Sequence, residues 1–247
     1  MVDMEVVIES RDGIDQLTQS TKIVKIRRPM LLGRSAIEAL SRGWPAGLES
    51  VVFENIDFSL IDRDKMDVFK LTQVLISSLF YKCRVLKKIS FTGCPLSGIV
   101  RPNSIEPAPS FISVVVGLVL LSSSIEEVVL DDCGLDDFSE IEKLFEKRLT
   151  LLSLRHHRLG NILKCISQPP LVQVLDISPI EVSEDDLSRF PNMRVISDNP
   201  MVVSKDSLGN SQEEDDSEFI ASDSVEDGST SSDDVSLVSE GSDLLKL

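Results

Sequence analysis

The sequence predicts an α/β repeat solenoid, in which short parallel strands alternate with mostly helical return segments, followed by a disordered acidic tail. One apolar pattern recurs along residues 21–200 of the 247-residue chain, and repetition with a period of roughly 20–50 residues indicates stacked repeats. The net charge of −16 is unevenly distributed. Residues 204–247 hold 13 Asp and Glu against two Lys, or −11, which leaves −5 for the first 203 residues.

The repeating unit has apolar residues at positions 4, 6 and 11, an apolar residue at position 1 in every full copy but the first, and a small or polar residue at position 9 in three of the six full copies. Copies cover residues 21–31, 48–58, 86–96, 125–135, 149–159 and 172–182, and a truncated last unit covers 193–202. Successive side chains of a strand point to opposite faces, so positions 4 and 6 predict a short strand with both side chains in the core. From Val24 to Leu175, the fourth positions lie 27, 38, 39, 24 and 23 residues apart.

The segments between the strands predict the return path. Ser35 with Glu38, and Ser139 with Glu142, fit capping boxes that begin return helices. Before the first repeat, residues 1–20 form a cap segment, whose apolar run at residues 6–8 is expected to cover the exposed edge of the sheet.

The two long units contain further helices. Val68, Leu71, Leu75 and Leu79 form a helical stripe that ends near residues 81–83. Residues 111–121 are almost wholly apolar but too few to span a bilayer, so they predict a buried helix. A proline-containing insertion, residues 97–110, precedes that helix.

The pattern LxxLxLxx(N/C)xL resembles the leucine-rich-repeat family over residues 21–203, as about six irregular repeats. Cysteine at position 9, in Cys94 and Cys133, is similar to the intracellular subclass typified by ribonuclease inhibitor, whereas Pro29, Ile56 and Ile180 depart from the pattern. The resemblance implies a curved parallel sheet on a concave side and helices on a convex side. It also implies a non-catalytic binding protein, with its protein partner on the concave face and no cofactor or small-molecule substrate.

Outward positions on the predicted strands define the candidate binding face. Asp131 and Asp132 are expected one turn from Arg155 and His156, around the exposed side chains of Val52 and Val129. The alternative is an ordinary solvated face with mutual charge pairs, which contribute little. The whole set is Lys25, Arg27, Val52, Glu54, Ser90, Thr92, Val129, Asp131, Asp132, Ser153, Arg155, His156, Asp176 and Ser178.

Cys94, Cys133 and His157 occupy position 9 in three successive units and are expected to stack. Thiolate and imidazole suit zinc, but the repeat geometry favours buried side chains bonded to the backbone, so we expect no metal. Cys133 and His157 would both face the interior, which disfavours nucleophilic catalysis. No nucleotide-binding or zinc-protease motif occurs. Cys83 and Cys165 fall on return segments and are predicted to be packing residues.

The acidic tail, residues 204–247, is too polar to bury a core, and its composition predicts disorder. Val235, Leu237 and Val238, flanked by acids, resemble a SUMO-interacting segment, which would add a strand to a sheet edge; the alternative is a solubilising tail. Residues with an acid three positions later are predicted phosphorylation sites: Ser211, Ser224, Thr230 and Ser231.

These features predict a protein-binding module whose partner the sequence does not identify. An acidic chain without a basic patch argues against nucleic acid and acidic membranes as partners. Four widely spaced cysteines and no signal-peptide pattern favour the cytoplasm, the nucleus or both. Alternatives within the repeat family are a GTPase-activating protein or a substrate-recognition subunit of a ubiquitin ligase.

Overall fold

The computed structural model describes residues 4–30, 32–58, 65–97 and 110–197. The chain divides into two units, residues 1–203 and 204–247, and every element below belongs to the first. The strands are β1 (Met4–Ile8), β2 (Thr21–Arg27), β3 (Ser50–Glu54), β4 (Lys88–Thr92), β5 (Glu127–Asp131), β6 (Leu149–Ser153), β7 (Val172–Asp176) and β8 (Arg194–Ile196).

The strands alternate with helical segments. The α-helices are α1 (Arg34–Gly43), α2 (Lys65–Lys82), α3 (Phe111–Leu121) and α4 (Glu184–Ser188). The 3₁₀-helices are η1 (Arg11–Gln16), η3 (Phe138–Glu140), η4 (Glu142–Glu146) and η5 (Ile162–Lys164). None of the helices among the described residues is both long and apolar enough to cross a membrane.

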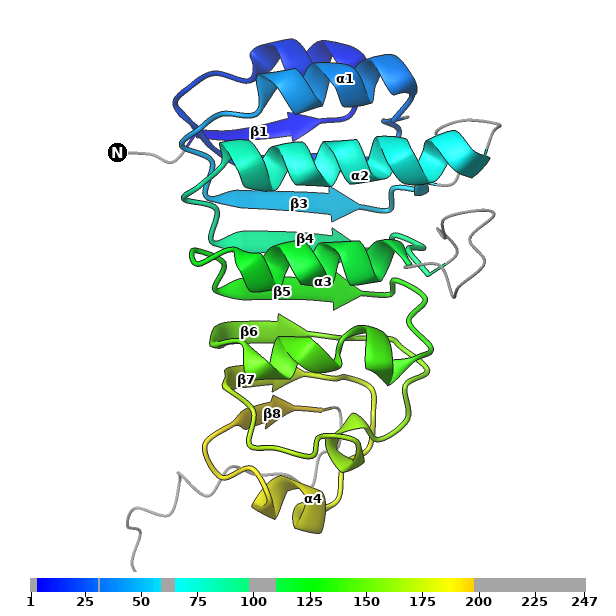
Figure 1. The fold of residues 1–247 in the computed structure, drawn as a ribbon, viewed down its shortest axis with the longest axis vertical. Helices are drawn as coiled ribbons and strands as arrows, with labels where there is room; N and C mark the ends of the chain where they lie inside the picture. Colours follow the sequence, from blue (N-terminus) through cyan, green and yellow to red (C-terminus); the bar gives the residue numbers. More distant parts are fainter. Residues whose placement is uncertain (1–3, 31, 59–64, 98–109, 198–247) are drawn as a thin grey trace, which may run out of the picture. The chain divides into compact units, whose positions relative to one another are not determined.

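All eight strands form one parallel sheet, and their order in the sheet is their order in the sequence. Each strand therefore pairs with its predecessor and its successor, as stacked repeats require. The helical segments α1, α2, α3, η3 and η4 lie over the same face of the sheet (Figure 1). The α/β class and the parallel sheet are as the sequence predicts.

The core lies between the sheet and these helices. Repeat position 4 contributes a row of paired, buried side chains that includes Val51, Ile89 and Val128. At position 6, the rings of Phe53 and Phe91 stack at 5.0 Å with 8° between their planes. The alternating apolar pattern thus becomes a continuous core shared by neighbouring coils.

The two predicted capping boxes are wrong. Gly33 precedes the first turn of α1 without a side-chain cap, and Ser35 lies inside the helix. Asp137, not Ser139, caps η3, because its carboxylate accepts a hydrogen bond from the Ser139 N–H at 2.8 Å. This bond lowers the pKa of Asp137.

The units that begin at residues 125 and 149 return by 3₁₀ turns instead of the helix expected near Ser139, whereas the unit that begins at residue 172 returns through α4. Because 3₁₀ geometry rises about 2.0 Å per residue against 1.5 Å for an α-helix, it covers the same distance with fewer residues. The longer units have room for α2 and α3, whose observed ranges agree with the predicted helices. Most of the predicted 97–110 insertion lies outside the described residues.

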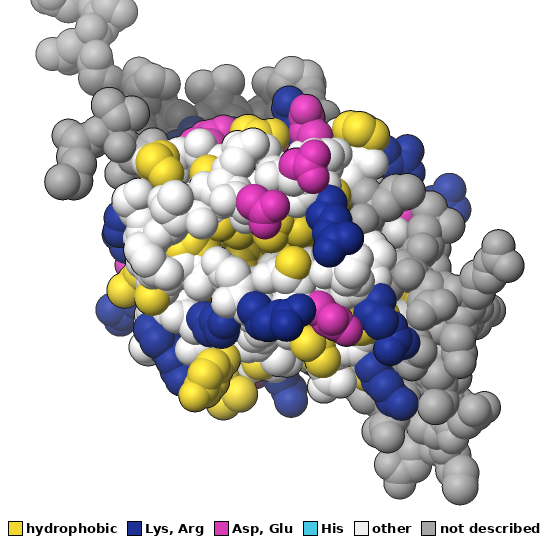
Figure 2. All heavy atoms as spheres, turned by 90° about the horizontal axis from the view of Figure 1, so that it is seen from above, with side chains coloured by type: hydrophobic (Ala, Val, Ile, Leu, Met, Phe, Trp, Pro, Cys, Tyr) yellow, Lys and Arg dark blue, Asp and Glu magenta, His cyan; other side chains and the backbone are white. Residues whose placement is uncertain are grey.

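The predicted cap segment contains an additional strand, β1, which pairs in parallel with β2. Val6 and Ile8 point into the core, while Val7 is 37% exposed. Figure 2, which views the molecule from this end, shows hydrophobic side chains in the middle of the surface and a band of Lys and Arg along one side. Pairing with β1 covers the edge of β2 that the cap segment is expected to protect.

Candidate interaction face

The turn after each central strand uses one backbone conformation. Asn55, Gly93, Asp132 and His156 occupy equivalent positions and have φ values of 54°, 63°, 52° and 60°. Left-handed backbone is open to Gly and tolerated best by residues such as Asn, Asp and His. Their N–H groups donate to a carbonyl of the next coil, at 2.8 to 2.9 Å. The turns therefore continue the backbone hydrogen bonding of the sheet beyond the ends of the strands.

The position-9 cysteines satisfy backbone groups within these turns. The Cys94 thiol is 3.4 Å from the Phe53 carbonyl oxygen, and the Cys133 thiol is 3.4 Å from that of Phe91. Both side chains are completely buried. Burial raises the pKa of Cys94 to about 11 and also raises that of Cys133. The structure thus holds both groups as neutral thiols that donate to the preceding coil.

His157 performs the same task in the next coil. Its Nδ1 accepts a hydrogen bond from the Leu135 N–H at 3.3 Å, and its Nε2 contacts the Leu130 carbonyl oxygen. Burial lowers the pKa of His157. Among the described residues, no group of three or more His, Cys, Asp or Glu is placed to hold a metal ion. The predicted stack is present, and its groups are bonded to the backbone.

The two remaining cysteines differ from each other. Cys83 is buried, its thiol donates to the Pro45 carbonyl at 3.3 Å, and burial raises its pKa to about 12. Cys165 is exposed, so its prediction as a packing residue is wrong. It follows η5, and its side chain points away from the core that Ile162 and Leu163 enter.

The helix-free face of the sheet, called the outer face below, carries the predicted binding residues in register. Its central row crosses all eight strands, from Val7 on β1 to Ile196 on β8. The row consists of Val7, Lys25, Val52, Ser90, Val129, Ser153, Asp176 and Ile196. A second row, nearer the carboxyl ends of the strands, pairs Arg27, Glu54, Thr92 and Asp131.

Cations on the outer face are largely neutralised by acids on the neighbouring strands. Lys25 is 3.0 Å from Glu5, and Lys88 is 3.0 Å from Glu127. Arg27 pairs with Glu9 at 2.7 Å. Arg155 and Asp176 form a weaker pair, because 3.9 Å separates their charged atoms. These half-exposed pairs contribute little stability. They do make the basic side chains less available to a binding partner than the sequence suggests.

Several of the predicted outward residues are covered. Val129 is 9% exposed, so the expected exposed valine at this position is wrong, while Val52 is only half-buried. Ser90, Ser153 and Ser178 are also buried. Adjacent strands stand only about 4.8 Å apart, so a small side chain such as Ser90 is covered by the longer ones paired with it, Val52 and Val129.

Asp131 on β5 connects the outer face to β6 and to the turn that follows it. Its Oδ1 accepts hydrogen bonds from the Ser153 hydroxyl at 2.6 Å and from the Arg155 N–H at 3.0 Å. Glu54 and Asp132 form no ion pair within the described ranges. The centre of this face therefore combines half-buried Val52 with acidic groups that have no cationic partner there.

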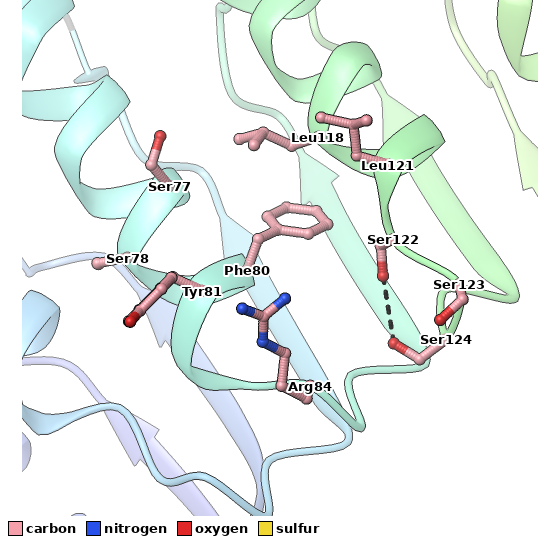
Figure 3. Close-up of a pocket in the computed structure, with 10 residues that line it drawn as sticks. All are labelled: Ser77, Ser78, Phe80, Tyr81, Arg84, Leu118, Leu121, Ser122, Ser123 and Ser124. Carbon is pink, nitrogen blue, oxygen red and sulfur yellow. Dashed lines mark hydrogen bonds between the residues drawn. The ribbon is translucent and has the colours of Figure 1, made fainter.

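A concave feature that the sequence did not predict lies on the helix side between the C-terminal ends of α2 and α3 (Figure 3). It is a groove of about 560 Å³. Its walls include Phe80, Tyr81 and Arg84 from the α2 side, and Leu118 and Leu121 from α3. Ser77, Ser78, Ser122, Ser123 and Ser124 complete the lining.

The tail sites predicted above lie outside the described residues: Ser211, Ser224, Thr230, Ser231, Val235, Leu237 and Val238. Comparison with protein-family models gives no match to this chain. Comparison with curated proteins gives no significant match either.

Proposed function

We propose that this chain is a non-catalytic interaction module of the leucine-rich-repeat type, which binds a protein partner on the outer face of its sheet. The bare face of a parallel sheet supports this proposal. Parallel sheets are nearly always covered on both sides, whereas here the helical segments cover only one. Such a face is available along all eight strands and needs no movement to receive a partner.

The composition of that face supports a protein partner. Its central row carries Val7, Val52 and Ile196 on β1, β3 and β8, with charged side chains such as Lys25 and Asp176 between them. A mixture of apolar and charged groups is typical of protein interfaces. Unneutralised Glu54 and Asp132 favour a partner that brings Lys or Arg to this region. Four free thiols fit the cytoplasm or nucleus, where cysteines stay reduced; in this proposal the acidic tail is a phosphorylatable regulatory or secondary contact.

The test is affinity purification with quantitative mass spectrometry on Glu54→Lys and Asp132→Asn chains, each of which removes one of the two unneutralised acids. Interface energy is concentrated in a few central residues, often about 2 kcal/mol each, so recovery of a true partner should fall more than tenfold. Lys143→Glu is the control, because Lys143 is exposed on η4 on the helix side. Thermal unfolding of all variants should match the parent, since Glu54 and Asp132 form no ion pair with a described residue and asparagine tolerates the positive φ of Asp132.

A chain ending at Val203 separates the two candidate binding elements. Partners retained by this chain but lost from the Glu54→Lys chain bind the outer face. Partners that ignore both outer-face substitutions and disappear with the tail would contradict the proposal, because the tail would then be the binding element.

A further inference from the structure

The helix layer carries its own unpartnered surface, on the opposite side of the core from the outer face. Leu121 at the end of α3 is 86% exposed, and Tyr81 near the end of α2 is 72% exposed. These side chains flank the α2–α3 groove shown in Figure 3. Exposure of large apolar groups to water is unfavourable, so their burial against another molecule would lower the free energy.

The sequence of α3 supports the same conclusion. A helix at the surface normally carries charged residues on its solvent side, but α3 has none in its 11 residues. Ser113 and Leu121 are nevertheless exposed, and a side chain added at Gly117 would meet no atom within 4 Å. The outward side of α3 therefore has accessible, uncharged residues, and Ser113 and Gly117 are small enough to allow close approach of another chain.

Arg84 defines the charge that the occupant must carry. Among the described residues it is the one charged side chain that lines the groove, and its guanidinium lies 5.3 Å from the centroid of the Tyr81 ring. It forms no ion pair with any described residue. Nearby Lys82 is occupied, because it donates to the Arg42 carbonyl at 2.7 Å. The groove thus combines apolar walls with one available cation and several serine hydroxyls.

A second copy of this chain cannot complement that charge through the same surface. Residues 68–85 and 110–125, which include the whole groove lining, contain no Asp or Glu. Two copies packed face to face would bring arginines together without a carboxylate. A membrane of anionic lipid is equally unsuited, because a single available cation gives only about 1 kcal/mol of attraction.

We propose that the α2–α3 groove docks a short segment of a partner protein, which places an apolar side chain between Tyr81 and Leu121 and a carboxylate on Arg84. Ser77 and Ser123 are also in the lining and supply hydroxyl groups for hydrogen bonds to the peptide backbone. Arginine forms two parallel hydrogen bonds with a carboxylate, which adds geometric selectivity. This site is independent of the outer face, so one chain joins two partners or two parts of one partner.

The test is selection of a random-peptide phage library on immobilised full-length chain. Peptides enriched on the parent should share a large apolar residue with an Asp or Glu close to it in sequence. The Arg84→Glu chain should lose those peptides at least tenfold and select Lys or Arg at the acidic position instead. Leu121→Asp should abolish enrichment, while Lys70→Glu, exposed on α2 outside the groove, should leave it unchanged.

Both Arg84 and Leu121 are exposed, so neither substitution should shift the unfolding temperature. Peptides enriched without an acidic residue, or unaffected by Arg84→Glu, would overturn the proposal. So would a dimer of the parent chain in sedimentation that Leu121→Asp dissociates, since the occupant would then be a second copy. Peptides lost in the Glu54→Lys chain and retained in the Arg84→Glu chain would place the binding on the outer face.

Discussion

Single residues in the turns after the strands control how closely one coil stacks on the next. Gly93 shows this most directly, because its φ of +63° coincides with close approach to the preceding coil. A Cβ at this position would lie 2.3 Å from Oδ1 of Asn55, itself a residue with positive φ. Glycine is therefore favoured at this position for two reasons: the backbone has a positive φ, and there is no room for a Cβ.

Gly93→Ala should destabilise the protein by about 2 kcal/mol or more, from left-handed strain plus displacement of Asn55. Gly160→Ala is the matched control: φ is +62° there, but no atom lies within 4 Å of the added carbon, so only the strain of about 1 kcal/mol remains. Urea unfolding followed by circular dichroism measures both. In an Asn55→Gly background the difference between the two substitutions should vanish; an undiminished difference would show that Asn55 is not the obstacle.

His157 should make stability depend on pH. Burial lowers its pKa below the ordinary value of 6.5, so the unfolded chain takes up a proton that the folded chain resists. The contribution is complete above about pH 6.5 and is lost progressively as pH falls below it. The free energy of unfolding, measured by urea titration between pH 7.5 and 5, should therefore fall less in His157→Asn than in the parent. His156→Asn, at an exposed neighbouring position, should retain the parental slope; equal slopes in all three proteins would exclude His157 as the source.

Strands and helices differ in how well the sequence predicts them. The repeats place β2 to β7 because alternating apolar residues, such as Val51 and Phe53, must share one buried face. The α2 and α3 ranges were also predictable, from a helical stripe and a long apolar run. The helix starts were not predictable. A serine three residues before a glutamate is common, and it caps a helix only if its own backbone is extended.

The candidate sites show the same limit. Register predicts which side chains share the outer face, because paired strands repeat the pattern at each coil. It does not predict that Val129 is covered, since coverage depends on neighbouring side chains. The α2–α3 groove depends on how two helices pack sideways, and the one advance signal was the absence of charge in residues 111–121.

Ser110 and Ser35 provide a test of capping at the level of the element. Ser110 has extended backbone, and its hydroxyl accepts a hydrogen bond from the Ser113 N–H at 3.1 Å. Ser110→Ala should therefore cost about 1 kcal/mol. Ser35→Ala should be neutral or slightly stabilising, because Ser35 is already inside α1 and alanine is the better helix former. Thermal unfolding of the two single variants decides the matter, and equal losses would mean that the capping box at Ser35 is real.

At the scale of the whole molecule, stability is the sum of neighbouring coils and not of one central core. β1 buries the edge of β2, as the complete burial of Val24 and Ile26 shows. The outer face and the α2–α3 groove lie on opposite sides of this stack, so a contact at one leaves the other open. The net charge of −11 in residues 204–247 adds solubility, while the composition of that segment predicts no contribution to the core.

Two truncations should therefore have opposite effects. Removing residues 1–20 deletes β1 and η1 and exposes the inner side chains of β2. Loss of buried Val6, Ile8 and Ile14 alone removes several kcal/mol, at about 1.5–3 kcal/mol for each buried side chain. That is a large part of the 5–15 kcal/mol that stabilises a typical domain, so this chain should unfold at much lower urea or associate through its bare edge. The chain ending at Val203 should keep the parental midpoint and slope in urea, because the charged and polar composition of the tail predicts no packed core of its own. Limited proteolysis of the parent should likewise leave a stable fragment ending near Val203. If removal of residues 204–247 lowers the midpoint while removal of residues 1–20 does not, the stack is capped by the acidic segment and the assignment of β1 as its stabilising first coil is wrong.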